Sequence, residues 1–208
     1  MKKALYIGCM ICFLLLGVTA PILAQSASNP SAALYDQAAA LLAQKQYDDV
    51  IRLLGGASLE DPYKFEPNWL LATALLEKCE QLKERGDTGY HHLVRRPYEI
   101  GLRLYKSQPS RPEPYYLIAR SLTINDRPHK AGKYILKAVY FSSPEHQHYP
   151  DFQMVLGDSW TGQMLQGNDR GYARAREAYQ KARDLRQGDP DFVTRIDRRL
   201  EYLETKRK

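Results

Sequence analysis

The chain has 208 residues, of which 44% are hydrophobic and 26% charged, and its net charge is +6. This length is enough for one ordinary domain with a sizeable core. The charge is mild and no helix is expected to carry a clustered basic stripe with base-reading side chains, so nucleic acid is not an expected partner. Cys79 is the one cysteine beyond the first 24 residues, so packing rather than an internal disulfide must hold the domain.

Residues 1–24 are typical of a signal peptide. Lys2 and Lys3 precede an apolar run over residues 4–18, and small residues lead to a predicted cleavage site after Ala24. The alternative is an uncleaved anchor, because residues 4–24 are nearly long enough to span a bilayer. We therefore expect a periplasmic or otherwise exported protein. Its domains would be a leader over 1–24, a disordered linker over 25–30 and a folded domain over 31–208.

Apolar residues three and four apart predict helices along the rest of the chain. Before residue 110 the predicted helices are 32–43, 47–54, 67–83 and 97–107. Gly55 and Gly56 are expected to stop the second helix. Residues 87–94, from Asp87 to Val94, are expected to form a loop that is longer than the other connections.

The later predicted helices are 115–124, 128–141, 150–166 and 171–187, followed by a ninth that starts at Asp189. Residues 142–149 are expected to be a loop. The ninth helix has one apolar stripe and an otherwise charged surface. No run alternates with period two beside a hairpin turn, so the fold class is all-α.

These helices form pairs with a recurring pattern of small residues. In the first pair the pattern positions are Leu34, Ala38, Leu41, Tyr47, Val50, Leu54, Ala57 and Pro62, and in the third they are Ala119, Leu122, Ala131, Ile135 and Ala138. Tyr172, Ala175, Tyr179 and Ala182 give the clearest single stretch of this kind, on one helical face. The pattern resembles the tetratricopeptide repeat, a helix-turn-helix unit of about 34 residues.

The resemblance covers about residues 31–187, with extra residues near 87–94 and 161–166. It implies a right-handed superhelix of about four antiparallel helix pairs, a TPR-like α-solenoid, with residues 189–208 as a capping helix. It also implies that the first helix of each pair lines a concave groove that binds a partner protein or peptide. The lysine-and-asparagine clamp that some members use is not recognisable, so chaperone binding is not expected.

The resemblance places one groove position of each repeat at an aromatic or thioether residue. These four are Tyr35, Trp69, Tyr116 and Met154, and the neighbouring groove position holds Arg120 and Asp158 in the last two repeats. Side chains of this kind often anchor partners. We expect Arg120 to orient a carboxylate of the bound segment. The alternative is that the rings only pack between adjacent repeats.

The sequence has no nucleophile, phosphate-loop or metalloprotease motif. His91, His92, His146 and His148 fall in expected loops without a framework of metal ligands. We therefore predict a non-catalytic interaction module or assembly adaptor of the bacterial envelope. It would have no cofactor or metal, and it would contact a membrane only through a retained leader. The alternative is an envelope enzyme acting on peptidoglycan or another polymer, and the 87–94 loop is a rival contact site.

Overall fold

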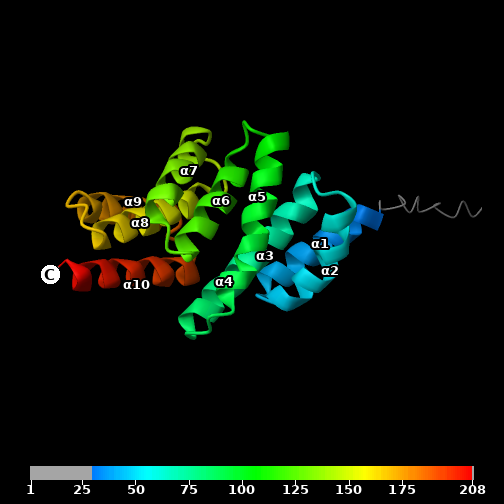
Figure 1. The fold of residues 1–208 in the computed structure, drawn as a ribbon, viewed down its shortest axis with the longest axis horizontal. Helices are drawn as coiled ribbons and strands as arrows, with labels where there is room; N and C mark the ends of the chain where they lie inside the picture. The colour runs from blue at the N-terminus through cyan, green and yellow to red at the C-terminus, as the bar shows by residue number, and fades with distance from the viewer. Residues whose placement is uncertain (1–29, 208) are drawn as a thin grey trace, which may run out of the picture.

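The computed structural model describes residues 30–207, which form ten helices and no strand (Figure 1). The predicted leader and its cleavage site lie outside the described residues, as does the predicted linker up to residue 29. The helices are α1 Pro30–Ala43, α2 Tyr47–Glu60, α3 Phe65–Glu84, α4 Tyr90–Leu93, α5 Arg95–Ser107, α6 Pro112–Ile124, α7 Pro128–Tyr140, α8 Tyr149–Leu165, α9 Gly171–Leu185 and α10 Pro190–Lys206. Within this part of the chain, no helix is both long and apolar enough to cross a bilayer.

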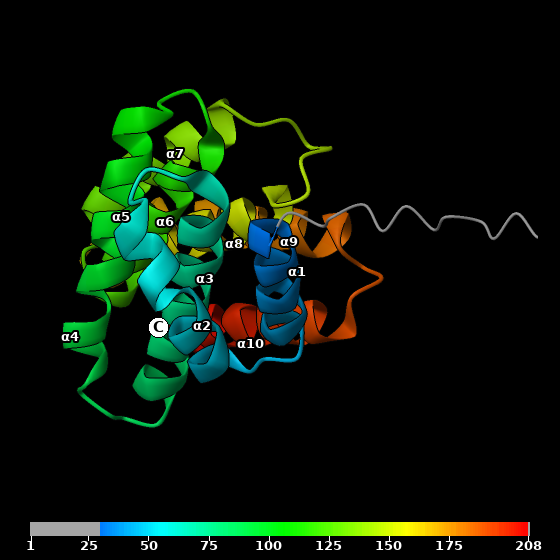
Figure 2. The same cartoon turned by 90° about the vertical axis from the view of Figure 1, so that its right-hand side faces the viewer.

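The long helices pack as antiparallel pairs that stack into a right-handed superhelix, as predicted. The pairs are α1 with α2, α3 with α5, α6 with α7, and α8 with α9. Helix α10 follows α9 and runs back beneath α8 and α9, so that its first turn points toward α3 (Figure 1). Seen along the long axis, α10 lies behind α1 and α2 (Figure 2), and Nζ of Lys45, just after α1, donates to Oδ2 of Asp191 at 2.7 Å. The capping helix thus also reaches across the inner side.

Small residues sit where two helices approach closely, which is the pattern that the repeat predicted. A Cβ added at Gly101 would lie 2.9 Å from the Cγ1 atom of Ile118, and one added at Gly157 would lie 2.4 Å from the Tyr179 ring. Ala175 and Ala182 are also fully buried, as expected for a packing face. The small residues of one helix therefore leave room for the larger side chains of the helix packed against it.

Helix α2 continues six residues past its predicted end at Leu54. The prediction that Gly55 and Gly56 stop it is wrong, because the following turn is held by tertiary contacts. The hydroxyl of Ser58 is buried and donates to Oδ1 of Asn68 on α3 at 2.7 Å. Packing of this kind routinely overrides the weak helix propensity of glycine.

Other boundaries differ from the prediction as well, and α3 and α5 each begin two residues earlier than expected, at Phe65 and Arg95. The expected 87–94 loop contains the single turn α4, whose Tyr90 is buried, and it leads directly into α5. Helix α6 begins at Pro112 rather than Tyr115, because proline fits the first turn of a helix, where its missing N–H is not needed. The expected loop at 142–149 is confirmed to within one residue.

Candidate partner-binding site

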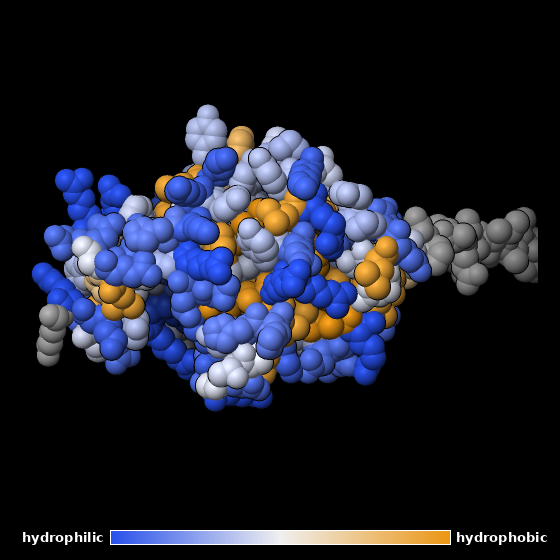
Figure 3. Space-filling model, viewed as in Figure 1, coloured by the Kyte–Doolittle hydropathy of each residue, from blue (hydrophilic) through white to orange (hydrophobic). Residues whose placement is uncertain are grey.

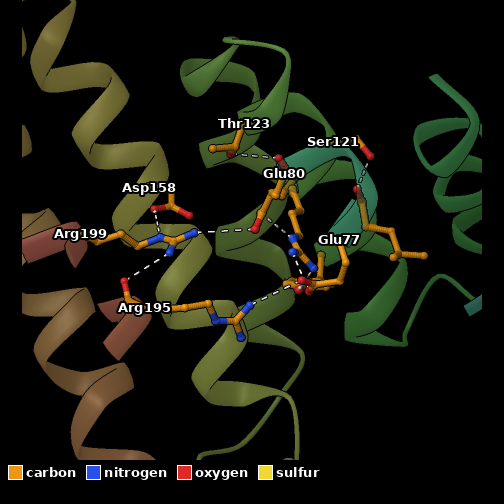
Figure 4. Close-up of polar contacts among 11 residues, drawn as sticks. Glu77, Glu80, Ser121, Thr123, Asp158, Arg195 and Arg199 are labelled. Carbon is orange, nitrogen blue, oxygen red and sulfur yellow. Dashed lines mark hydrogen bonds and ion pairs between the residues drawn. The ribbon is translucent and has the colours of Figure 1, made fainter. Parts of the chain in front are cut away.

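The inner side of the superhelix is lined by ionic groups from four helices. Glu77 and Glu80 stand three residues apart on α3, so they share a helical face. Facing them are Arg120 from α6, Asp158 from α8, and Arg195 and Arg199 from α10. Figure 4 shows Arg195 and Arg199 directed toward the two glutamates and Asp158. The network therefore connects repeats that are far apart in the sequence.

Arg120 is the centre of this network and is 2% exposed. Its Nη2 atom donates to Oε1 of Glu77 at 2.8 Å, and its Nε atom donates to Oε1 of Glu80 at 3.0 Å. Its Nη1 atom donates to the hydroxyl of Tyr116 at 3.1 Å. Burial would raise the pKa of Glu80, but the charges of Arg120 and then Arg199 outweigh it and lower that pKa to about 2. Glu80 is thus held as a carboxylate.

Helix α10 closes the network from the other side. Nε of Arg199 donates to Oδ1 of Asp158 at 2.8 Å, and the same oxygen accepts the hydroxyl of Tyr179 at 2.8 Å. Nη2 of Arg199 lies 4.0 Å from Oε2 of Glu80, and Nη1 of Arg195 lies 3.7 Å from Oε2 of Glu77. These contacts bridge α3 and α10 across the inner side.

Two cavities flank this bridge, with volumes of about 490 and 660 Å³. Both are lined by Glu80, Glu84, Arg195 and Arg198. Glu84 and Arg198 are exposed, and neither forms an ion pair with any residue in the described range 30–207.

The two cavities also differ in their other walls. The smaller adds two exposed apolar side chains, Leu165 at 52% and Tyr202 at 46% exposure. The larger adds Thr73, whose buried Oγ1 atom has no hydrogen-bond partner within the described residues. The inner side therefore combines a centre of paired ionic groups with open cavities that are lined by residues of both charges.

The six residues predicted to bind a partner lie in different environments. Arg120 and Asp158 belong to the inner ionic network, and Asp158 also lines the smaller cavity. Tyr116 touches both the network and a ring cluster, while Met154 is buried in the core beside Tyr179. Arg120 already holds two carboxylates of its own chain, so it does not present a free guanidinium to a partner. The binding role of the six stays a prediction.

Trp69 lies in a cluster of rings at the start of the inner helices. Its ring centroid is 5.9 Å from that of Tyr116 and 4.9 Å from that of His148. Tyr35 on α1 is separate from this cluster and packs beneath Nζ of Lys64, 5.1 Å from the ring centroid. Both Trp69 and Tyr35 are half-buried. The structure therefore joins Trp69 with Tyr116 but does not continue the stripe through Tyr35 and Met154.

The histidines of the 142–149 loop are packed rather than free in solvent. His148 rests on Trp69, and His146 lies 5.5 Å, centroid to centroid, from the Phe152 ring. Nε2 of His146 is 3.6 Å from Oε1 of Glu113. In the described part of the chain, no three His, Cys, Asp or Glu side chains come together in a way that could hold a metal ion.

Sequence reasoning missed Glu77, Glu80, Arg195 and Arg199, although a weak signal was present. The two glutamates are three residues apart on an inner helix, and the two arginines are four apart beside the apolar stripe of α10. Such spacing is common on solvated faces. It did not by itself indicate that these groups meet.

Comparison with known proteins supports the fold. No protein-family model matches the chain, and no curated protein matches it significantly in sequence. Among solved structures, it is similar to a thermophilic TPR protein of Thermus thermophilus, with a TM-score of 0.59 and 15% identity. That similarity covers 81% of this chain and 80% of the other. The chain therefore has a TPR-like helical fold.

Proposed function

We propose that this chain is a non-catalytic adaptor that binds a segment of a partner protein along its inner side, next to α10. The TPR-like fold supports the general role. The leader-like sequence at residues 1–24 supports a place in the bacterial envelope, where the adaptor would assist assembly of a complex. The inner cavities are the candidate binding site for the partner segment.

The observation that carries the proposal is the contrast between satisfied and unsatisfied ions on the inner side. The cations of Arg120, Arg195 and Arg199 balance the carboxylates of Glu77, Glu80 and Asp158, which favours a structural centre over acid–base catalysis. Glu84 and Arg198 line both cavities and have no ionic partner within residues 30–207. A segment that presents a cation to Glu84 and a carboxylate to Arg198 fits this arrangement, with apolar side chains against Leu165 and Tyr202.

Site-specific photocrosslinking tests the proposal. A photoreactive amino acid is placed at Tyr202 of the full chain, and crosslinking is done in the envelope of the source cells. We expect one dominant crosslinked partner, and its yield should fall about tenfold or more when Glu84→Arg and Arg198→Glu reverse the two charges. Melting curves check that the variant is folded.

Leu59 provides the matched control, because it is 79% exposed but lies on α2, outside both cavities. The same photoreactive residue at Leu59 should not capture that partner. Equal capture at Leu59, or a yield that does not respond to the charge reversal, would show that the inner side is not the binding site.

A further inference from the structure

The outward face of α7 differs from every charged surface described so far. Helix α7 contains three lysines and no acidic residue. Its exposed residues recur three and four apart and thus share one side of the helix. We define the α7 face as these residues with Phe141, which follows them: His129, Lys130, Lys133, Leu136, Lys137, Tyr140 and Phe141. The sequence alone predicted no basic stripe, so this face is a finding of the structure.

The lysines of the α7 face are not neutralised by the chain. Within residues 30–207, none of Lys130, Lys133 and Lys137 forms an ion pair. The side chain of Lys137 places its Nζ 5.7 Å from the centroid of the Tyr115 ring. The three arginines of the inner ionic network, in contrast, each meet a carboxylate. The lysines therefore remain available to an external anion.

The surroundings of the face are strongly positive as well. Residues 95–141 contain ten lysines and arginines but three acids. One of the ten, Arg120, is buried and paired with Glu77 and Glu80, which leaves nine cations against three acids outside the inner network. Each of the three acids has its own cation: Glu99 pairs with Arg95, Glu113 with Arg111 and Asp126 with Lys83. No unpaired carboxylate in residues 95–141 would repel an anionic surface.

Large apolar side chains stand exposed among these lysines. Tyr140 is 81% exposed, Leu136 48% and Phe141 42%. Rings continue inward from them, since Tyr140 contacts Phe141, Phe141 stacks on Tyr115, and Tyr115 meets Tyr105 edge-on. Figure 3 shows apolar residues exposed between hydrophilic ones on the side of the molecule that faces the viewer in Figure 1. Exposed aromatic and leucine side chains beside lysines are the composition of membrane-interface helices.

We propose that the α7 face binds the surface of a bilayer that contains anionic phospholipid. Lysines would attract the headgroups, and Leu136, Tyr140 and Phe141 would enter the interfacial layer. The face carries lysine rather than arginine, which supports a membrane over an acidic protein segment as its ligand. Lysine acts as a flexible point charge that suits a diffuse anionic surface, whereas the inner network of this chain uses arginine to hold defined carboxylates.

The position of the face is compatible with partner binding on the inner side. Helix α7 lies on the far side of the stack from α10 in both views (Figures 1 and 2). A membrane-bound molecule would therefore keep its inner cavities accessible. The inference uses no residue of the inner side, so its failure would leave the proposed function unaffected.

Vesicle flotation of the full chain tests this proposal. We expect binding to phosphatidylcholine vesicles that contain phosphatidylglycerol, little binding to pure phosphatidylcholine, and release at high salt. Combined Lys130→Gln, Lys133→Gln and Lys137→Gln changes should weaken the partition about a hundredfold, from roughly fivefold per lysine near an anionic surface. The single change Tyr140→Ser should also weaken vesicle binding. This loss would reflect a missing apolar contact, because the substitution leaves the charge of the face unchanged.

A matched control removes three exposed cations elsewhere, through Arg52→Gln, Arg85→Gln and Lys206→Gln. This variant has the same net charge as the lysine variant and should lose much less affinity. Equal binding by wild type and lysine variant, or equal losses in the two variants, would overturn the proposal. Lysine-dependent binding of polyglutamate without vesicle binding would overturn it too, in favour of an acidic polypeptide partner.

Discussion

Arg120 illustrates how one buried cation organises the inner side. Two carboxylates and a tyrosine hydroxyl occupy its guanidinium, which is 2% exposed. Deleting one partner of a buried ion pair leaves an uncompensated charge and typically costs about 3–5 kcal/mol. For the guanidinium of Arg120 to bind a ligand, these contacts would have to break. The geometry therefore favours a structural function for Arg120.

Glu80 makes this network sensitive to acid. Its pKa falls from 4.5 to about 2 in the folded chain, so the unfolded chain takes up the proton first. The stability that the carboxylate contributes is complete above about pH 4.5 and is lost as the pH falls toward 2. We expect the Glu80→Gln variant to lose less stability than wild type over this range. Between about pH 4.5 and 2, the two proteins' losses in free energy of unfolding should differ by an amount on the order of 3 kcal/mol.

Urea unfolding at a series of pH values, followed by circular dichroism, measures this difference. Glu60 is exposed at the end of α2 and serves as the control, since Glu60→Gln should follow the wild-type curve. If wild type and Glu80→Gln lost stability in parallel on acidification, the depressed pKa of Glu80 would be wrong.

At the scale of single helices, glycines have opposite roles in α2 and α8. Gly56 lies inside α2, and a Cβ at this position would meet no atom within 4 Å. Gly157 lies inside α8, directly against the buried Tyr179 ring. The identity of the residue alone does not distinguish the two cases. The neighbouring helix decides whether a glycine merely weakens its helix or is required for packing.

The same substitution at the two sites should therefore have opposite effects. Gly56→Ala should raise the free energy of unfolding by about 0.5–1 kcal/mol, because alanine favours the helix and restricts the unfolded chain. Gly157→Ala should lower it by about 1–3 kcal/mol, because the methyl group overlaps the Tyr179 ring. Chemical denaturation measures both. Shifts of the same sign would contradict this assignment of the two glycines.

At the scale of the whole molecule, α10 acts as both a cap and a bridge. Its apolar stripe of Phe192, Ile196 and Leu203 is buried in one core cluster with Tyr179 of α9. Its arginines reach α3 and α8, and Nζ of Lys45 in the α1–α2 turn lies 2.7 Å from Oδ2 of Asp191. This last pair is exposed and contributes little by itself. The half-buried contacts of Arg195 and Arg199 are the ones that should fix the curvature of the stack.

Removing the bridge should open the inner side without detaching α10 from α9. We expect Arg195→Gln with Arg199→Gln to lengthen and broaden the distance between spin labels at Gln44→Cys and Thr194→Cys. Electron–electron double resonance measures that distance in a chain with Cys9→Ser and Cys12→Ser. Cys79 can stay, because burial raises the pKa of its thiol to about 12 and keeps it unreactive.

Arg198→Gln is the control for the loss of a cation from α10, since Arg198 is exposed and has no ionic partner in the described chain. It should leave the distance distribution unchanged. A distribution that stays narrow in the double variant would mean that apolar packing alone sets the position of α10.

The sequence by itself determined the helices, their pairing and the positions of small packing residues. Those features depend on the helical period and on the packing of helices that follow one another in the chain, so the spacing of residues within a short stretch of sequence indicates them. It could not place Arg120 against Glu77, 43 residues earlier, or Arg199 against Asp158, 41 residues earlier. Charged residues on an inner and an outer helix face look alike in sequence. Only the curvature of the superhelix brings some of them together, and leaves the lysines of α7 exposed and unneutralised.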